Sequence, residues 1–292
     1  MKSVPSIIRK TYPQRGPLQQ FRFVDSLAFR CFRCTATKKS KLITIYGGDW
    51  SKRLCNGCYG YLLSLYKIKA GTKADSEKTE QLANLLFKAV TLDDQLQAER
   101  LYRVSEERAE HLSQEALRFV STSEHVARQL QSGPELEWSP AVIGLCKAVE
   151  LEVVNRILKP LANGVSNTDL GADKSDKDVG RVAAFCANPT RNPPELGAFA
   201  HFLQTVVHSH RRRSTSVLMV NFLQLAKEWT GSNWLLDATA FHQSLTHLIT
   251  RFRNRAAHID ELGKEDYVAC RDLTIGTQGI IWQLLVATQR HR

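Results

Sequence analysis

The sequence predicts a mainly α-helical chain that begins with a small, basic, cysteine-rich module containing a short β-hairpin. Three observations predict this fold class. Two C-x2-C pairs occur before residue 60, apolar residues recur with helical spacing beyond residue 76, and no convincing alternating strand follows residue 60. With 292 residues and 43% apolar content, the chain can bury a substantial core in about two domains.

Positive charge is concentrated at the start of the chain. Residues 1–70 contain 14 Lys or Arg residues and two acidic ones, a net charge of +12, whereas residues 71–292 carry −1. A small basic module tethered to a neutral body favours attraction to a polyphosphate backbone. A basic face that only improves solubility is the alternative interpretation.

Neither a membrane span nor a signal peptide is recognisable in the sequence. No run approaches the roughly 18 uncharged apolar residues of a membrane span, and Met1–Lys10 does not resemble a signal peptide. We therefore expect a soluble, cytoplasmic protein without membrane contact. Three cysteines, Cys146, Cys186 and Cys270, lie singly in apolar helical patterns, where a free thiol behaves as a small hydrophobe.

The other four cysteines form two pairs with twenty residues between them: Cys31, Cys34, Cys55 and Cys58. Each C-x2-C can sit on one tight turn with both sulfurs aimed at the same point, and two such turns complete a tetrahedral S4 shell for structural Zn²⁺. Residues 41–46 alternate and are β-branched, and Gly47-Gly48-Asp49 supplies a turn, so we expect a hairpin between the pairs, as in a zinc ribbon. Two disulfides or a redox-active pair are the alternatives.

Basic and aromatic residues surround these cysteines. Cations can contact phosphates while rings stack on unpaired bases. The candidate nucleic-acid-binding residues are Arg30, Arg33, Lys38, Lys39, Lys52 and Arg53. The candidate rings are Phe32, Tyr46, Trp50, Tyr59 and Tyr61, some of which must form the core of the module instead. Recruitment of a protein is the alternative use of this module.

The chain divides into three predicted segments. A short helix at 59–68 and a polar break at 71–76 close the basic module, residues 1–70. Residues 71–132 read as a helical connector, with a capping pattern at Thr91 and Asp94. Residues 133–292 read as a helical bundle. Its helices are expected at 139–159, 179–186, 196–208, 215–229, 234–259 and 266–286, with a loop at 163–178 and a run of His and Arg at 208–213 whose roles the sequence leaves open.

A second group of polar residues lies near the carboxyl end, in Arg253-Asn254-Arg255-Ala256-Ala257-His258. The guanidinium can neutralise a phosphorane and the imidazole can move a proton near pH 7, which suits phosphoryl transfer without a metal. On a straight helix Arg253 lies roughly 140° from His258. Joint action therefore needs a curled Arg side chain, a distorted turn or a second copy across a dimer. We expect truncation of either side chain to cost little packing.

The R-N-x3-H pattern, late in an all-helical domain, resembles the signature of the HEPN ribonuclease superfamily. The resemblance covers about the last 160 residues, so it implies a HEPN-like bundle. The segment S-P-A-x3-L-x-K-A-x-E at 139–150 resembles the first long helix of HEPN domains. In that family an acidic residue there can face the active cleft, and Glu150 is the matching position. A solvent-facing role for Glu150 is the alternative.

The resemblance implies a metal-independent endoribonuclease in which the RNA 2′-hydroxyl attacks the adjacent phosphate. His258 would move the proton, Arg253 would stabilise the phosphorane, and Asn254 would orient the imidazole or hold a phosphate oxygen. It also implies a homodimer or higher oligomer, a toxin or phage-defence role, and room for a protein partner or an antitoxin. The alternative is a non-catalytic zinc-ribbon regulator that binds nucleic acid or polymerase, with an inert HEPN-like dimerisation domain.

Overall fold

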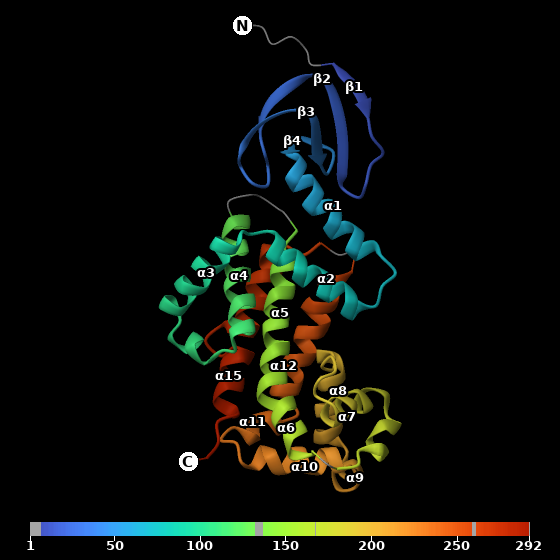
Figure 1. Cartoon of the computed structure of the whole chain (residues 1–292), viewed down its shortest axis with the longest axis vertical. Helices are drawn as coiled ribbons and strands as arrows, with labels where there is room; N and C mark the ends of the chain where they lie inside the picture. The colour runs from blue at the N-terminus through green and yellow to red at the C-terminus, as the bar shows by residue number, and fades with distance from the viewer. Residues whose placement is uncertain (1–6, 132–136, 167, 259–260, 292) are drawn as a thin grey trace.

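The computed structural model describes residues 7–131, 137–166, 168–258 and 261–291. A small antiparallel sheet stands at one end of the molecule, and helices form the rest (Figure 1). The prediction of a mainly α chain with a small N-terminal β module is confirmed. Among the helices of the described residues, none combines the length and apolar character needed to cross a lipid bilayer.

The described strands form one sheet in the order β1-β2-β3-β4, all antiparallel. They are β1 (Ile8–Thr11), β2 (Leu18–Arg30), β3 (Thr37–Tyr46) and β4 (Asp49–Leu54). The expected hairpin is β3–β4, where Gly47 and Gly48 take the left-handed backbone with φ of 61° and 74°. Sequence reasoning missed β1 and β2, because an irregularity between Arg22 and Leu27 interrupts the alternation of β2.

Two clusters of buried side chains hold the sheet. Leu18, Tyr46 and Leu54 join the main core of the molecule, whereas Phe23, Phe29 and Ile43 form a separate small cluster. The module is therefore attached to the helical body through part of its own hydrophobic interior.

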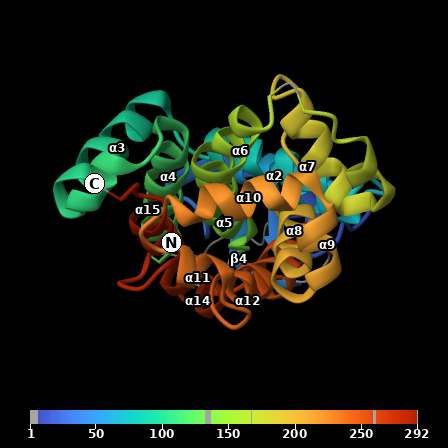
Figure 2. The same ribbon diagram turned by 90° about the horizontal axis from the view of Figure 1, so that it is seen from below.

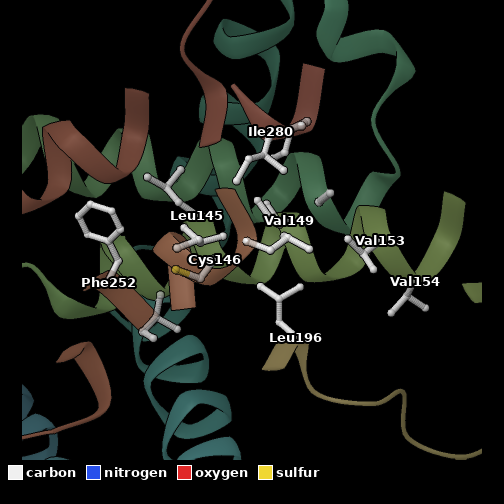
Figure 3. Close-up of a cluster of buried hydrophobic side chains, with 14 of the residues drawn as sticks. Leu145, Cys146, Val149, Val153, Val154, Leu196, Phe252 and Ile280 are labelled. Carbon is white, nitrogen blue, oxygen red and sulfur yellow. The ribbon is translucent and has the colours of Figure 1, made fainter. Parts of the chain in front are cut away.

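Helix α5 is the central element of the body (Figure 2). The helices before and including it are α1 (Asn56–Ala70), α2 (Asp75–Lys88), α3 (Leu92–Ser105), η1 (Glu107–His111), α4 (Gln114–Gln131) and α5 (Ser139–Val153). Nearly every residue of α5 is buried, and Leu145, Cys146 and Val149 pack near Phe252 and Ile280 from the carboxyl-terminal part of the chain (Figure 3).

The segment read as a connector, residues 71–132, contributes to the main core. Helices α2 and α4 pack directly on α5, and α3 packs on α4. Helix α5 lies very close to α4 and α2 at Gly144, because a Cβ added to this glycine would lie 2.1 Å from Ser123 Oγ and 2.6 Å from Leu86 Cδ2. The capping box of Thr91 and Asp94 is present at the start of α3. The predicted boundary at 132/133 lies outside the described residues.

The helix predicted at 139–159 extends further than expected. Beyond α5 it continues through a π-helical turn, η2 (Val154–Leu158), into α6 (Lys159–Gly164), which has Pro160 in its first turn. Proline lacks the backbone N–H of a regular helical turn, and here it directly follows the π-helical turn, where the N–H of Lys159 donates to the carbonyl of Val154, so the helix continues past it. The loop predicted at 163–178 contains η3 (Gly171–Ser175), where the buried Asp173 accepts hydrogen bonds from the Ser216 hydroxyl and the Leu218 amide.

The remaining helices complete the body around α5. They are α7 (Lys177–Ala187), α8 (Leu196–His208), α9 (His210–Thr215), α10 (Val217–Lys227), α11 (Ser232–Leu236), α12 (Phe241–His247), η4 (Leu248–Arg253), α13 (Asn254–Ala257), α14 (Lys264–Ile275) and α15 (Ile280–Ala287).

Two of the predicted long helices are divided. The one expected at 234–259 breaks after α11, where Asp237 accepts hydrogen bonds from the Thr239 amide and hydroxyl, and its expected last residue lies outside the described residues. The one expected at 266–286 breaks between α14 and α15. A Cβ on Gly276 would lie 2.4 Å from the carbonyl oxygen of Asp272, so the chain turns there on a residue without a side chain.

Candidate active site and metal centre

The four paired cysteines converge. Cys31 follows β2, Cys34 lies in the turn before β3, Cys55 follows β4, and Cys58 is in the first turn of α1. Their sulfurs all lie within 4.8 Å of one another, and Cys34 Sγ is 3.9 Å from Cys55 Sγ. The backbone N–H of Cys55 donates to Cys31 Sγ at 3.3 Å. The structure therefore brings together a set of sulfurs that can hold one metal ion.

The geometry and acidity of these thiols fit a tetrahedral S4 centre. A metal–sulfur distance of about 2.3 Å places tetrahedral sulfurs roughly 3.8 Å apart, close to the observed 3.9 Å. The hydrogen bond from Cys58 lowers the pKa of Cys31 to about 4, whereas the same contact raises the pKa of Cys58. Cys31 and Cys58 thus cannot both ionise easily side by side, and a cation held among the four sulfurs would remove that penalty.

The six basic candidates of the module fall into two groups. Arg30, Lys38 and Lys39 are exposed, and Arg30 Nε donates to the carbonyl of Thr35 at 3.0 Å. Arg33, Lys52 and Arg53 are half-buried. The first group is the more accessible to a phosphate.

The half-buried group takes part in the structure of the module. The Arg33 guanidinium lies 4.0 Å from the centre of the Tyr61 ring and its Nη1 lies 4.0 Å from Cys58 Sγ, so its charge lies beside the cysteine cluster. Lys52 Nζ lies 5.7 Å from the centre of the Phe32 ring. Arg53 Nε donates to the carbonyl of Trp50 at 3.0 Å.

The candidate rings differ in access. Tyr46 is a core residue, and burial raises its pKa to about 12. Phe32, Tyr59 and Tyr61 are partly buried against the main core. Trp50 is 44% exposed and packs against Phe21 with ring centres 4.7 Å apart.

Arg253 lies inside the protein. The residue is 4% exposed, and its Nη2 is 3.8 Å from Glu150 Oε2 on α5. Its Nε is buried and forms no hydrogen bond within the part of the chain that is described. The expectation that Arg253 can be truncated at little packing cost is therefore wrong. The helix is distorted here, because η4 is π-helical, but Arg253 pairs with Glu150 of α5 rather than with His258.

Glu150 belongs to a chain of alternating charges between α5 and α2. Lys147 Nζ lies 2.5 Å from Glu150 Oε1 and 2.5 Å from Glu80 Oε1. Burial opposes the charge of Lys147, but the two carboxylates outweigh it and raise the pKa of this lysine. Glu150 is only 8% exposed, so it is not solvent-facing, and its charge is compensated on both sides by Lys147 and Arg253.

His258 lies at the surface, directly after α13. Its backbone is extended (φ −100°, ψ −174°), and its side chain is 53% exposed. Its Nε2 is 3.3 Å from Oδ2 of Asp75, the first residue of α2. Asn254, the first residue of α13, is half-buried.

Sequence reasoning missed Asp75, Glu80 and Lys147 as neighbours of the motif. Asp75 belongs to the polar stretch that reads as a linker, and Glu80 is an ordinary acidic residue of a helix. Lys147 is part of the S-P-A-x3-L-x-K-A-x-E segment, three residues before Glu150. This spacing places the two side chains next to each other on a helix, so the sequence alone could have indicated their ion pair.

The basic module docks beside the motif. The hydroxyls of Tyr46 and Tyr66 both donate to Oε1 of Glu261, at 3.0 and 2.9 Å. Glu261 is three residues beyond His258, and α1 also packs against α13. The module is therefore joined by hydrogen bonds to a residue close in sequence to His258.

The structure thus groups Arg253 with Glu150 inside the bundle and His258 with Asp75 at its surface, and α2 contacts both groups.

Comparison of the chain with models of protein families, with curated proteins and with solved structures gave no match.

Proposed function

We propose that this protein is a metal-independent HEPN-type endoribonuclease that cleaves RNA by attack of the 2′-hydroxyl on the adjacent phosphate. The observation that carries the proposal is the position of His258. It is exposed, paired with a carboxylate, one turn beyond Asn254, and next to the docking contact of a +12 module. An accessible imidazole beside a polyphosphate-binding surface is suited to proton transfer on RNA.

In this proposal His258 transfers the proton and Asp75 orients its ring. Asn254 orients the imidazole or holds a phosphate oxygen. Arg253 stabilises the phosphorane after its side chain leaves Glu150. Lys147 then keeps Glu150 neutralised, so the departure of Arg253 does not strand a buried carboxylate. The Nε of Arg253 has no hydrogen-bond partner among the described residues, so the departure of the side chain breaks no hydrogen bond at that atom.

The proposal extends to assembly and biology. A homodimer or higher oligomer would bring two copies of the motif together across a two-fold interface. The protein would act in the cytoplasm as a toxin or phage-defence effector that cleaves RNA. A protein partner or an antitoxin would control its activity. This role rests on analogy with HEPN proteins.

The first test is cleavage of mixed cellular RNA by the purified full chain. We expect cleavage to persist in EDTA, products to end in a 2′,3′-cyclic phosphate, and a substrate with a single 2′-deoxy residue at the cut to be inert, because the attacking group is then absent. Bound metal and circular dichroism should be measured in the same samples, to separate unfolding of the module from loss of chemistry. Products that end in a 3′-hydroxyl would contradict the mechanism.

The second test concerns the metal centre, which we propose holds structural Zn²⁺. Elemental analysis should find one zinc per chain, and Cys55→Ser should reduce this to well below one and destabilise the module, because an S4 centre contributes directly to folding. Cys186→Ala, at a buried cysteine outside the cluster, is the matched control and should keep its zinc. A full zinc content in Cys55→Ser would place the metal elsewhere.

A non-catalytic zinc-ribbon regulator that binds nucleic acid or polymerase remains the second candidate. The burial of Arg253 favours it, because a guanidinium held at 4% exposure cannot contact a phosphate without moving. RNA binding without cleavage under all the conditions above would select this function.

A further inference from the structure

A cavity of 340 Å³ lies between the β1–β2 loop and α1. Its lining residues are Arg15, Gly16, Leu63, Tyr66, Lys67, Lys69 and Ala70. We propose that this cavity binds one unpaired base of an RNA strand and so positions that strand beside His258. The inference rests on the proposed function, because it assigns a binding subsite to the same RNA substrate.

The cavity combines apolar walls with a cationic rim. Leu63, Ala70 and the Tyr66 ring supply the apolar surface. Lys69 adds no accessible charge, since its Nζ is buried 3.1 Å from Glu137 Oε2. Arg15 and Lys67 are exposed at the edge, where they can meet the phosphates on either side of a bound base. This combination of a ring and flanking cations is how proteins hold single-stranded nucleic acid.

The ring of Tyr66 is held in place and is half-buried, and part of it lines the cavity. Its hydroxyl donates to Glu261 at 2.9 Å, which holds the ring in place. Gly16 takes the left-handed backbone with φ of 59°, and a Cβ at this position would lie 3.8 Å from Tyr66 Cγ. Glycine therefore both permits the turn and keeps a side chain off the ring.

The position of the cavity connects it to the motif. Tyr66 lines the cavity and binds Glu261, three residues beyond His258, so the proposed strand would enter beside the part of the chain that follows the motif. An apolar protein side chain is the other occupant that such walls would accept. The charge of the module, +12 with Asp25 and Asp49 as its acidic residues, favours the polyanion.

The test measures binding separately from cleavage. A short single-stranded RNA carrying 2-aminopurine, with every 2′-hydroxyl methylated so that it cannot be cut, is titrated into the full chain. We expect fluorescence quenching on binding, and Tyr66→Ala to weaken the affinity by roughly 5- to 150-fold and to remove the quenching, since stacking on a ring is lost. Tyr66→Phe keeps the stacking ring but loses the bond to Glu261, so it should retain the quenching and bind more tightly than Tyr66→Ala. Ala70→Trp, which fills the cavity without removing a core group, should act like Tyr66→Ala.

Lys67→Ala and Lys10→Ala are a matched pair, because each removes one exposed charge from the module. Lys67→Ala should weaken RNA binding more than Lys10→Ala does, because Lys67 lines the cavity and Lys10 does not. Equal affinity in Tyr66→Ala, Ala70→Trp and the unchanged protein would overturn the proposal and leave the cavity to an apolar protein side chain. The cleavage assay tests the proposed function independently. Quenched binding without cleavage of unmodified RNA would reject the nuclease and support the base-binding cavity. Cleavage of unmodified RNA, with no effect of these variants on binding, would support the nuclease and reject the base-binding cavity.

Discussion

Replacement of His258 by alanine is expected to lower the rate of RNA cleavage by about 10²- to 10⁴-fold, because one proton-transfer group is lost. The fold should remain, since the side chain is 53% exposed beyond the end of α13, and such truncations usually change stability by less than about 0.5 kcal/mol. Initial rates on a defined RNA, with thermal unfolding and zinc content of the same samples, provide the measurement.

His247→Ala is the matched control for this variant. His247 is an exposed imidazole on α12, in the same continuous helical segment but outside the motif, so its loss should leave the cleavage rate unchanged. An unchanged rate in His258→Ala as well would exclude the proposed chemistry and favour the non-catalytic regulator. Arg253→Ala is a less informative variant, because its burial against Glu150 mixes a stability effect with any catalytic one.

Replacement of Lys69 by methionine is expected to destabilise the protein by about 3–5 kcal/mol, the usual cost of removing one partner of a buried ion pair. Lys69 and Glu137 have side-chain exposures of 1% and 0% and lie 3.1 Å apart. Glu137 also accepts hydrogen bonds from the amides of Ser139 and Leu262, at the start of α5 and after the motif. Methionine preserves the length of the side chain, so the lost charge is the main change.

Denaturant unfolding measures this loss. The double variant Lys69→Met with Glu137→Gln should regain part of the stability, because the unpaired carboxylate is removed along with its partner. Lys67→Met changes an exposed lysine of the same helix and should have little effect. A loss below about 1 kcal/mol in Lys69→Met would show that Glu137 is compensated by its other contacts.

The features that sequence predicted are those set by nearby residues. The spacing of Cys31 and Cys34, and of Cys55 and Cys58, defines two local turns, and Gly47-Gly48 defines the hairpin between them. Side-chain periodicity likewise located most of the helices. In each case a few consecutive residues contain the whole signal.

The features that sequence missed depend on contacts between distant segments. Asp75 meets His258, and Glu80 meets Lys147, across separations that no local pattern encodes. Periodicity also assumes 3.6 residues per turn, whereas the π-helical turn η4 changes the phase of the helix just before Arg253. The orientation of Arg253 toward Glu150 was for this reason beyond the reach of helical spacing.

Helix α2 contacts both parts of the motif, His258 through Asp75 and the Arg253 group through Glu80 and Lys147. Its contact with His258 is direct, whereas its contact with Arg253 passes through Lys147 and Glu150 of α5. Because α2 follows α1, which carries Cys58 in its first turn, these two successive helices connect the cysteine cluster to both groups.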